Sequence, residues 1–419
     1  STKEAPVSGI KVLVAGASIA GPALAHWLRR RGAEVTVVER APELRPGGQA
    51  VDARGVAKEV IRRMGLDAAV RAACTDTVGA FKVDVDGNVL ETFRADDDGG
   101  DGFIAEIEIL RGDLSRVLHD DTRDGVEYVF GDRIAELTQD TDGVDVVFAG
   151  GDRRRFDLVV GADGLHSALR GMVFGRRERF VRHLGLVLAF YSVPNEFGLD
   201  RWLIDYQDQE SGRSAGLRPI QDATRAMAMF SFPSVDFDVD YRDVAAQKSL
   251  LRERMEGLGW LTPRILAHLD ETPDFYLDQV AQVVTDRWSS GRVVLLGDAA
   301  LMELVERAIK ASSYPTTPGC RTPGPRSDRR SPRRPGRRRG CRGSGALDPQ
   351  SCCVVGVPEP LADVPAAGRV ADDMPTGGGD RMPPVGSGAS TVDRLTASMT
   401  ARCGWASAIQ PPQAPIGSL

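Results

Sequence analysis

The chain has 419 residues and carries 53 lysines and arginines against 59 aspartates and glutamates, a formal net charge of −6. This balance argues against a general nucleic-acid binder, because such proteins need an excess of positive charge. No apolar run reaches about 18 residues, so the sequence predicts no membrane-spanning helix, and its length allows two or three domains.

Cysteine usage and the N-terminal run bear on the location of the protein. Cys74 is the only one of the six cysteines that lies before residue 300, which fits a reducing compartment. The N-terminal run is apolar and contains Lys3 and Lys11, as a signal peptide would, but we interpret it as the first strand and helix of the fold. We therefore expect a cytoplasmic protein.

The strongest signal is a strand, a tight turn and a helix near the N-terminus. Residues 10–15 are typical of a buried parallel strand, and the apolar spacing over 22–31 predicts a helix. The turn between them consists of Gly16, Ala17, Ser18, Ile19, Ala20 and Gly21. Its two glycines allow a sharp turn and close packing, and the N-terminus of the helix favours a pyrophosphate. Ser18 stands where the usual pattern has a glycine.

A second apolar run follows and ends in a carboxylate. Residues 35–39 predict a strand, and Glu39 comes about 20 residues after the turn, where an acid binds a ribose hydroxyl in dinucleotide sites. An ordinary strand–helix turn is the alternative for the hexamer alone. The strand, helix, second strand and terminal acid together favour a dinucleotide site.

The next segments alternate between helical and strand patterns. We expect an amphipathic helix over 55–64 and a hairpin over 81–90. Residues 104–110 predict a strand that ends at Arg111, and Asp113 is expected to cap a helix over 114–121. Arg111 would thus lie at a strand end, where doubly wound folds bind ligands. The alternative is a surface ion pair.

Four further strands are expected before residue 161. The segments 126–130, 134–138 and 144–148 predict a three-stranded meander. The strand expected over 156–160 then runs into Gly161-Ala-Asp163-Gly164, so an acid and a glycine again occupy a strand-to-helix turn. An aspartate that merely caps a helix is the alternative.

The segment 181–284 is strand-like and rich in aromatic residues, with a helix expected near 244–258. Six of its aromatic residues either line a pocket for a flat substrate or form the core of a sheet: Phe190, Tyr191, Trp202, Tyr206, Phe230 and Phe232. The stretch 288–300 then predicts one more strand, which ends in Gly297-Asp298.

These motifs, in this order and spacing, resemble those of the group A FAD-dependent monooxygenases. This family comprises para-hydroxybenzoate hydroxylase-like aromatic and polyketide hydroxylases, including tetracycline-inactivating flavoenzymes. The resemblance covers residues 8–300 approximately and rests on the first turn, Glu39-Arg40, Arg111, Asp163-Gly164 and Gly297-Asp298. It implies an α/β fold, with a Rossmann-like FAD-binding domain and an interleaved mixed-sheet substrate domain.

The resemblance also implies roles for the motif residues. The FAD pyrophosphate would lie over Gly16–Gly21 and the adenosine ribose on Glu39, with Arg40 and Arg111 beside the cofactor. Gly297-Asp298 would hold the ribityl chain.

Asp163-Gly164 would support both the FAD site and a transient encounter with NAD(P)H. In this family NAD(P)H reduces the flavin, O₂ forms a C4a-hydroperoxide, and one oxygen passes to an electron-rich carbon. The implied function is therefore hydroxylation of an aromatic or polyketide-like small molecule. No acid–base catalytic residue is implied, and no nucleic-acid or membrane partner is expected.

The expected domain boundaries follow from the same resemblance. The FAD-binding domain is expected in three parts and the substrate domain in two, before a low-order tail. In chain order these are FAD-binding 1–75, substrate hairpin 76–103, FAD-binding 104–180, substrate-binding 181–280, FAD-binding 281–310 and tail 311–419.

The tail departs from the family pattern. After Gly297-Asp298 the family continues with a proline and a glycine-rich helix start, whereas this chain becomes rich in Arg, Pro and Gly, with nine arginines from Arg326 to Arg342. We expect a solvated run there, and the spacing of Cys352-Cys353 predicts no metal site. Translation out of frame is one hypothesis for the tail. A catalytically impaired FAD-binding remnant, or a non-oxygenating reductase or desaturase of the same fold, is therefore the alternative function.

Overall fold

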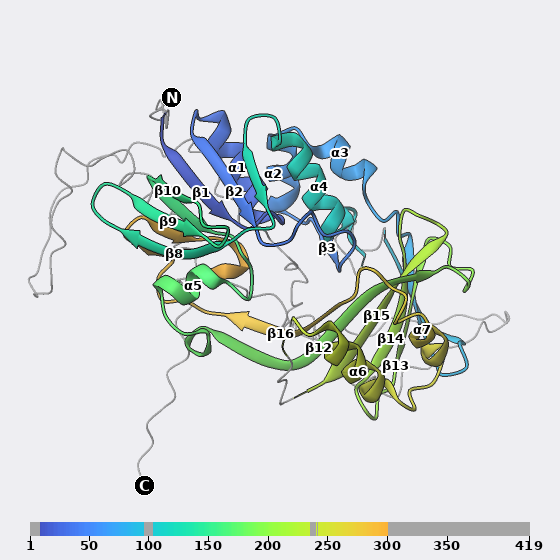
Figure 1. The fold of residues 1–419 in the computed structure, drawn as a ribbon. Helices are drawn as coiled ribbons and strands as arrows, with labels where there is room; N and C mark the ends of the chain where they lie inside the picture. Colours follow the sequence, from blue (N-terminus) through green and yellow to red (C-terminus); the bar gives the residue numbers. More distant parts are fainter. Residues whose placement is uncertain (1–8, 96–103, 235–239, 241, 301–419) are drawn as a thin grey trace, which may run out of the picture.

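The computed structural model describes residues 9–95, 104–234, 240 and 242–300. Its two main units are a largely parallel sheet with helices and a second, larger mixed sheet (Figure 1). The α/β class with mixed sheets, as expected from the sequence, is confirmed. The tail predicted over 311–419 lies outside the described residues, and the domain boundaries stay a prediction.

The first sheet has six strands, and all of its pairings are parallel except the one at the β17 edge. Across the sheet the strands are β17 (Ser289–Ser290), β18 (Val293–Leu295), β11 (Leu158–Gly161), β1 (Lys11–Ala15), β2 (Glu34–Glu39) and β7 (Glu127–Phe130). The central strands are apolar on both faces because both faces are covered.

The helix α1 (Ala20–Arg30) packs on one face of this sheet, and a small antiparallel sheet packs on the other together with α5 (Ala168–Val173). The other described helices are α2 (Val56–Met64), α3 (Asp67–Ala72), α4 (Arg111–Thr122), α6 (Val244–Met255), α7 (Thr262–Ala267) and the short 3₁₀ turns η2 (Arg177–Arg179) and η3 (Gly297–Ala299). Leu24 and Leu28 of α1 pack on Val12 and Val14. None of the helices in these residues is long and apolar enough to cross a membrane.

The covering sheet corrects the predicted meander. Its three strands are β8 (Ile134–Gln139), β9 (Val144–Phe148) and β10 (Arg153–Phe156). The first expected strand of the meander is instead β7, which pairs in parallel with β2. The short connection after β7 suggested a hairpin, but Tyr128 and Phe130 pack with the core beside α1, and this burial places β7 in the larger sheet.

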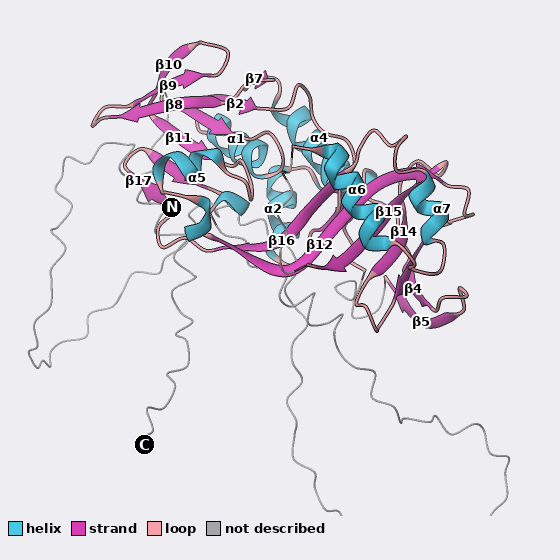
Figure 2. Cartoon of the chain, turned by 60° about the horizontal axis from the view of Figure 1, so that its bottom comes forward, coloured by secondary structure: helices cyan, strands magenta, loops and turns pink. Residues whose placement is uncertain are grey.

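The second main sheet has seven strands, and Figure 2 shows it beside the first unit, with α6 and α7 lying against it. Across the sheet the strands are β16 (Tyr276–Val283), β12 (Val181–Pro194), β15 (Arg225–Pro233), β14 (Ser214–Pro219), β13 (Trp202–Gln207), β4 (Gly79–Val83) and β5 (Val89–Arg94). The expected hairpin is present as β4 and β5, which pair antiparallel.

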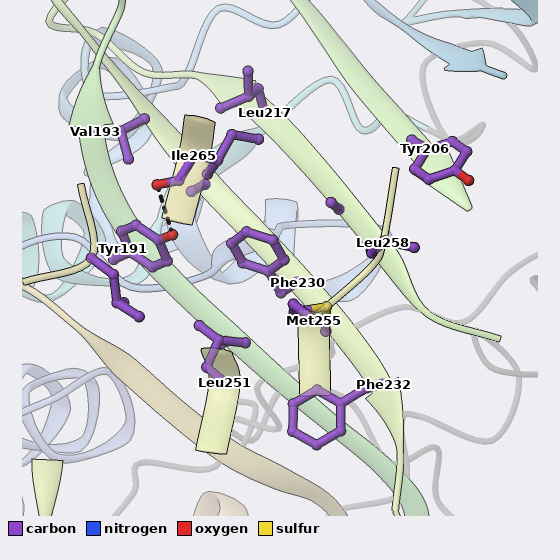
Figure 3. Packing of buried hydrophobic residues seen from close by; sticks show 14 of the residues in the cluster. Tyr191, Val193, Tyr206, Leu217, Phe230, Phe232, Leu251, Met255, Leu258 and Ile265 are labelled. Carbon is purple, nitrogen blue, oxygen red and sulfur yellow. Dashed lines mark hydrogen bonds between the residues drawn. The ribbon is translucent and has the colours of Figure 1, made fainter. Parts of the chain in front are cut away.

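The core of this second unit lies between the sheet and its two helices. Figure 3 shows Tyr191, Phe230 and Phe232 packed with Leu251 of α6, while the Tyr191 hydroxyl donates to the Ile265 carbonyl at 3.1 Å. Burying each of these large side chains contributes about 2–3 kcal/mol to folding. Because side chains alternate along a strand, the opposite face of the sheet is left to face the first unit.

A two-stranded sheet, β3 (Ala50–Asp52) with β6 (Glu108–Leu110), lies outside both main sheets. The strand expected over 104–110 is therefore short, although Ile104 and Ile107 are fully buried. Burial explains their apolar character without strand pairing. The helix expected at 114 begins at Arg111, after Leu110 as its N-cap, so Asp113 lies inside the first turn and the predicted cap is wrong.

Candidate functional site

Three strand ends of the parallel sheet lie side by side and bring three turns together. Ala15 at the end of β1 is the register partner of Gly161 in β11, and Gly161 is the partner of Leu295 in β18. The Ala162 amide donates to the Ala15 carbonyl at 2.8 Å, and the Leu296 amide donates to the Gly161 carbonyl at 2.8 Å. The three glycine-containing turns that the sequence singled out therefore meet at one edge of the sheet.

Glycine is required where these turns touch. Gly16 has a φ of +108°, and a Cβ there would lie 2.4 Å from the Ala162 carbonyl oxygen. A Cβ at Gly21 would lie 1.9 Å from the Gly16 carbonyl oxygen. Gly297, with a φ of +60°, approaches the start of α1, because its Cβ would lie 3.1 Å from the Cβ of Ala20. Larger residues would push the turns apart.

The first turn leaves the N-terminus of α1 open. Ile19 is the N-cap residue, and its side chain cannot accept a hydrogen bond from the first amides of the helix. Ala17 is buried, and Ile19 packs toward α2 and α4. The Ser18 hydroxyl lies 3.4 Å from the Ser115 hydroxyl of α4. Backbone amides and one small hydroxyl therefore dominate this turn, which suits a phosphate group.

Glu39 links the first turn to the end of β2. Its Oε2 accepts from the Ala17 amide at 3.0 Å, and its Oε1 accepts from the Ala41 amide at 2.9 Å. Each carboxylate oxygen has a further lone pair for another donor. Glu39 thus has a structural role that the sequence did not reveal, and it keeps the capacity to accept a ligand hydroxyl.

Three arginines lie close enough to interact electrostatically beside these turns. Desolvation by the surrounding protein and the charge of Arg40 lower the pKa of Arg45; Glu39 opposes this effect, and Arg111 adds to it. Neighbouring like charges disfavour each other's charged forms, and a bound anion would relieve that repulsion. Sequence reasoning selected Arg40 and Arg111 but missed Arg45, because only its neighbours in the fold distinguish it from a loop residue.

The loop that carries Arg45 is bound to the start of α4. The Arg111 amide donates to the Gln49 carbonyl at 3.0 Å, and the Gly112 amide donates to the Gly47 carbonyl at 2.9 Å. A Cβ at Gly47 would lie 2.7 Å from Asp274 Oδ2 of the second unit. This loop therefore lies between the start of α4 and the seven-stranded sheet.

Asp163 binds the first amides of the helix after the second turn, which is the helix-capping role that the sequence offered as the alternative. Its Oδ2 accepts from the Ala168 and Leu169 amides at 2.8 and 3.2 Å, at the start of α5. Its Oδ1 is buried and has no hydrogen-bond partner among the described residues. Gly164 follows with a φ of +77°. The carboxylate thus holds α5 and retains one unused oxygen.

A buried arginine joins the second and third turns. Arg170 is 1% exposed, and its guanidinium donates to the Ala299 carbonyl at 3.0 Å and to the Leu165 carbonyl at 2.6 Å. Burial lowers its pKa, while Asp163 opposes that effect. Sequence reasoning missed this residue because its partners lie on other turns.

Asp298 lies on the third turn and interacts electrostatically with Arg111. Its side chain is exposed, yet the dense protein around it raises the pKa of its carboxyl by desolvation, and the charge of Arg111 opposes that rise. The structure therefore relates the first residue of α4 to the third turn, although 187 positions separate them in the sequence.

The second unit contributes an acidic and aromatic group to the same region. Asp278 is buried, and its Oδ2 accepts from His166 Nε2 at 2.6 Å and from the Tyr276 hydroxyl at 3.4 Å. Tyr276 interacts electrostatically with Arg111 and Asp298. None of the three residues of this group was selected from the sequence.

A second buried contact joins the two units at β6. Glu108 is 5% exposed; its Oε1 accepts from the Thr75 and Thr77 hydroxyls at 2.7 and 2.8 Å, and its Oε2 forms an ion pair with Arg218 of β14. Burial by itself would raise the pKa of Glu108, but the charge of Arg218 and the hydrogen bonds lower it overall. Because Glu108 precedes Arg111 by three residues, this ion pair connects the seven-stranded sheet to the start of α4.

Most of the aromatic residues proposed for a pocket lie instead in the core of the second unit, whereas Phe190 lies on the opposite face of its sheet. Four of them, Tyr191, Tyr206, Phe230 and Phe232, belong to the core beneath α6 and α7. Trp202 stacks on Phe81 with ring centroids 4.2 Å apart. Phe190 alternates with Tyr191 and is the register partner of Tyr276, on the face away from the helices.

Comparison with known proteins agrees with this geometry. The family described as FAD binding domain matches residues 9–306. A Mycobacterium tuberculosis protein, described as uncharacterized, is 46% identical over 293 residues, which are 69% of this chain and 77% of that protein. A flavin-dependent monooxygenase of Legionella longbeachae is 37% identical over 297 residues, 69% of this chain and 74% of that protein.

Solved structures point in the same direction. The crystal structure of tetracycline destructase Tet(51) is 35% identical, with a TM-score of 0.63, and the match covers 70% of this chain and 75% of that chain. The chain therefore belongs to the FAD-binding domain family, as a group A flavin-dependent monooxygenase.

Proposed function

We propose that FAD binds along the edge where the three turns meet. The pyrophosphate lies over Gly16–Gly21, beside Arg40, Arg45 and Arg111. The adenosine ribose binds Glu39. The open N-terminus of α1 at this edge carries the proposal, because its first amides have no side-chain cap and suit a phosphate group. The charges of Arg40 and Arg111, which lower the pKa of Arg45 together with desolvation, support it, since a pyrophosphate would relieve that repulsion.

The remaining motif residues complete the proposed site. Asp298 holds the ribityl chain, next to Arg111. Asp163-Gly164 supports the cofactor from the second turn and borders the place where NAD(P)H docks transiently. The unused Oδ1 of Asp163 supports this role, because a buried acceptor without a partner is costly until a donor reaches it.

FAD, when bound, supplies the redox and oxygen chemistry, with NAD(P)H as the electron source and O₂ as the oxidant. The protein contributes binding, orientation and exclusion of water. The loop at Gly47 and the face of the seven-stranded sheet carrying Met227 enclose the region beside Arg111; a Cβ at Gly47 would lie 3.7 Å from the Met227 methyl group.

We propose an electron-rich aromatic or polyketide-like molecule as the substrate. The sheet face away from α6 and α7 carries half-buried apolar side chains, Leu186, Leu188 and Phe190, which alternate with core residues of β12. Such a surface suits a flat, largely apolar ligand. The names of two similar structures, tetracycline destructases Tet(51) and Tet(55), add support for a polycyclic substrate.

The test combines flavin content, NAD(P)H oxidation and isotope incorporation. Purified protein is mixed with NADH or NADPH and with a tetracycline, a simple phenol or an anthraquinone, under ¹⁸O₂. We expect one compound to stimulate NAD(P)H oxidation and to gain one ¹⁸O atom. Flavin-dependent oxidation of NAD(P)H without incorporation of ¹⁸O into any compound would instead favour the alternative function, an impaired remnant or a non-oxygenating enzyme.

A matched pair of variants locates the substrate face. Leu188→Lys places a charge on the proposed face, and we expect a higher KM for the substrate with unchanged FAD content. Leu90→Lys, at a position 65% exposed on β5, is the control and should leave KM unchanged. An unchanged KM in Leu188→Lys would contradict this placement of the substrate.

A further inference from the structure

Tyr276, Asp278 and His166 form a hydrogen-bonded group that connects the two units. Asp278 is 7% exposed, and both of its oxygens are used: Oδ2 by His166 and Tyr276, and Oδ1 by the Gln279 amide at 2.8 Å. A buried carboxylate is tolerated only when it is well partnered. Because His166 comes from the turn after Gly164, the group fixes β16 against the second glycine turn.

The phenol of Tyr276 lies among the charged residues of the proposed cofactor site. Its pKa is raised, first by burial and then by the charge of Asp278, while Arg111 opposes and Asp298 adds to the rise. The hydroxyl therefore stays protonated and donates to Asp278. The interactions with Arg111 and Asp298 place the ring near Asp298, which we assign to the ribityl chain that leads to the flavin, and near Arg111, which we assign to the pyrophosphate.

The ring lies on the face of the sheet away from α6 and α7, which is the face that we propose for the substrate. Leu277, the next residue along β16, belongs to the core beneath α6 and α7, whereas Tyr276 pairs with Phe190 on the opposite face, with ring centroids 6.3 Å apart. Neither aromatic ring is fully buried. The two half-buried rings, tilted 31° to each other, provide an apolar surface of the kind that an aromatic ring system packs against.

We propose that Tyr276 contacts the isoalloxazine ring of FAD and that Asp278 and His166 are positioning residues that hold its phenol there. The proposal rests on the proposed FAD site. It assigns to β16, a strand of the seven-stranded sheet, a direct contact with the cofactor.

Flavin fluorescence tests the contact directly, since a tyrosine ring touching an excited flavin quenches it by electron transfer, whereas phenylalanine does not. With FAD bound, Tyr276→Phe should lengthen the fluorescence lifetime, and Tyr276→Trp, a stronger quencher, should shorten it. FAD affinity should change little in Tyr276→Phe, because the hydroxyl donates to Asp278. Tyr191→Phe is the matched control on the helix-covered face of the same sheet and should leave the lifetime unchanged.

The positioning role has a separate test. Asp278→Asn keeps the Tyr276 ring but weakens the hydrogen bond that positions it. We therefore expect a broader distribution of flavin fluorescence lifetimes than in the wild type, with FAD still bound. The same lifetimes in wild type, Tyr276→Phe and Tyr276→Trp, all with FAD bound, would overturn the contact. A wild-type protein that binds no FAD would instead overturn the proposed site itself.

Discussion

Glu39→Ala is the most informative single substitution in the proposed cofactor site. The side chain accepts hydrogen bonds from the Ala17 and Ala41 amides and has lone pairs left for the two ribose hydroxyls. A hydrogen bond to a charged group contributes roughly 1.5–3 kcal/mol. We therefore expect FAD to bind about ten- to a hundredfold more weakly in the variant.

The structure adds a second effect, on folding. Removing the carboxylate leaves the Ala17 amide of the turn and the Ala41 amide after β2 without their acceptor, and we expect the free energy of unfolding of the apoprotein to fall by about 1–3 kcal/mol. Glu39→Gln offers one acceptor oxygen where two are needed, so its FAD affinity and stability should lie between those of wild type and Glu39→Ala.

The assay is a titration of flavin-free protein with FAD, followed by flavin fluorescence, together with urea unfolding of the same samples. Glu34→Ala, at the exposed start of the same strand, is the control and should change neither quantity. If Glu39→Ala loses stability but binds FAD as tightly as wild type, then the carboxylate only holds the turn, and its proposed contact with the ribose is refuted.

Three other substitutions test the remaining parts of the site. Gly21→Ala should destabilise the protein by about 1–3 kcal/mol in urea unfolding, because its Cβ would overlap the Gly16 carbonyl; wild-type stability would show that the turn can relax. Glu108→Gln should cost about 3–5 kcal/mol at pH 7, since it leaves Arg218 without its charged partner. The pKa of Glu108 is lowered in the folded state, so its contribution exists above the unfolded value near 4.3 and is lost as pH falls through the folded value. Wild type should therefore lose more stability than Glu108→Gln between pH 7 and acid conditions, and equal losses would contradict this. Asp298→Ala should weaken FAD about tenfold or more in the fluorescence titration, and unchanged affinity would remove Asp298 from the site.

The parts of the fold that local sequence patterns determine were predicted well. The strand before Gly16, the helix after it and the strand that ends at Glu39 appear as β1, α1 and β2. The amphipathic helix over 55–64 appears as α2, one residue shorter. In each case short-range spacing of apolar residues and glycines decides the structure.

Errors arose where distant partners decide the structure. The sequence around β7 predicts the first strand of a meander, because the connection to the next strand is short. In the structure β7 is packed beside α1 and pairs with β2. Asp113 is of a residue type that often caps helices, yet α4 begins at Arg111, where the loop carbonyls of Gln49 and Gly47 accept from its first amides.

The candidate site shows the same division. Its glycine turns are visible in the sequence, because each is a continuous motif. Arg45, Arg170 and the group of Tyr276, Asp278 and His166 are not, since their significance depends on contacts between turns and between sheets. Asp278 and His166, for example, are 112 residues apart in the sequence.

The central claim is that the three turns form one FAD site, and the flavin content of the purified protein tests it most directly. Protein denatured in acid releases its cofactor for identification and counting, and a parallel titration compares FAD with NAD. We predict close to one FAD per chain and no tight binding of NAD. Absence of flavin, failure of added FAD to bind, and tight binding of NAD at the same turns would contradict the claim.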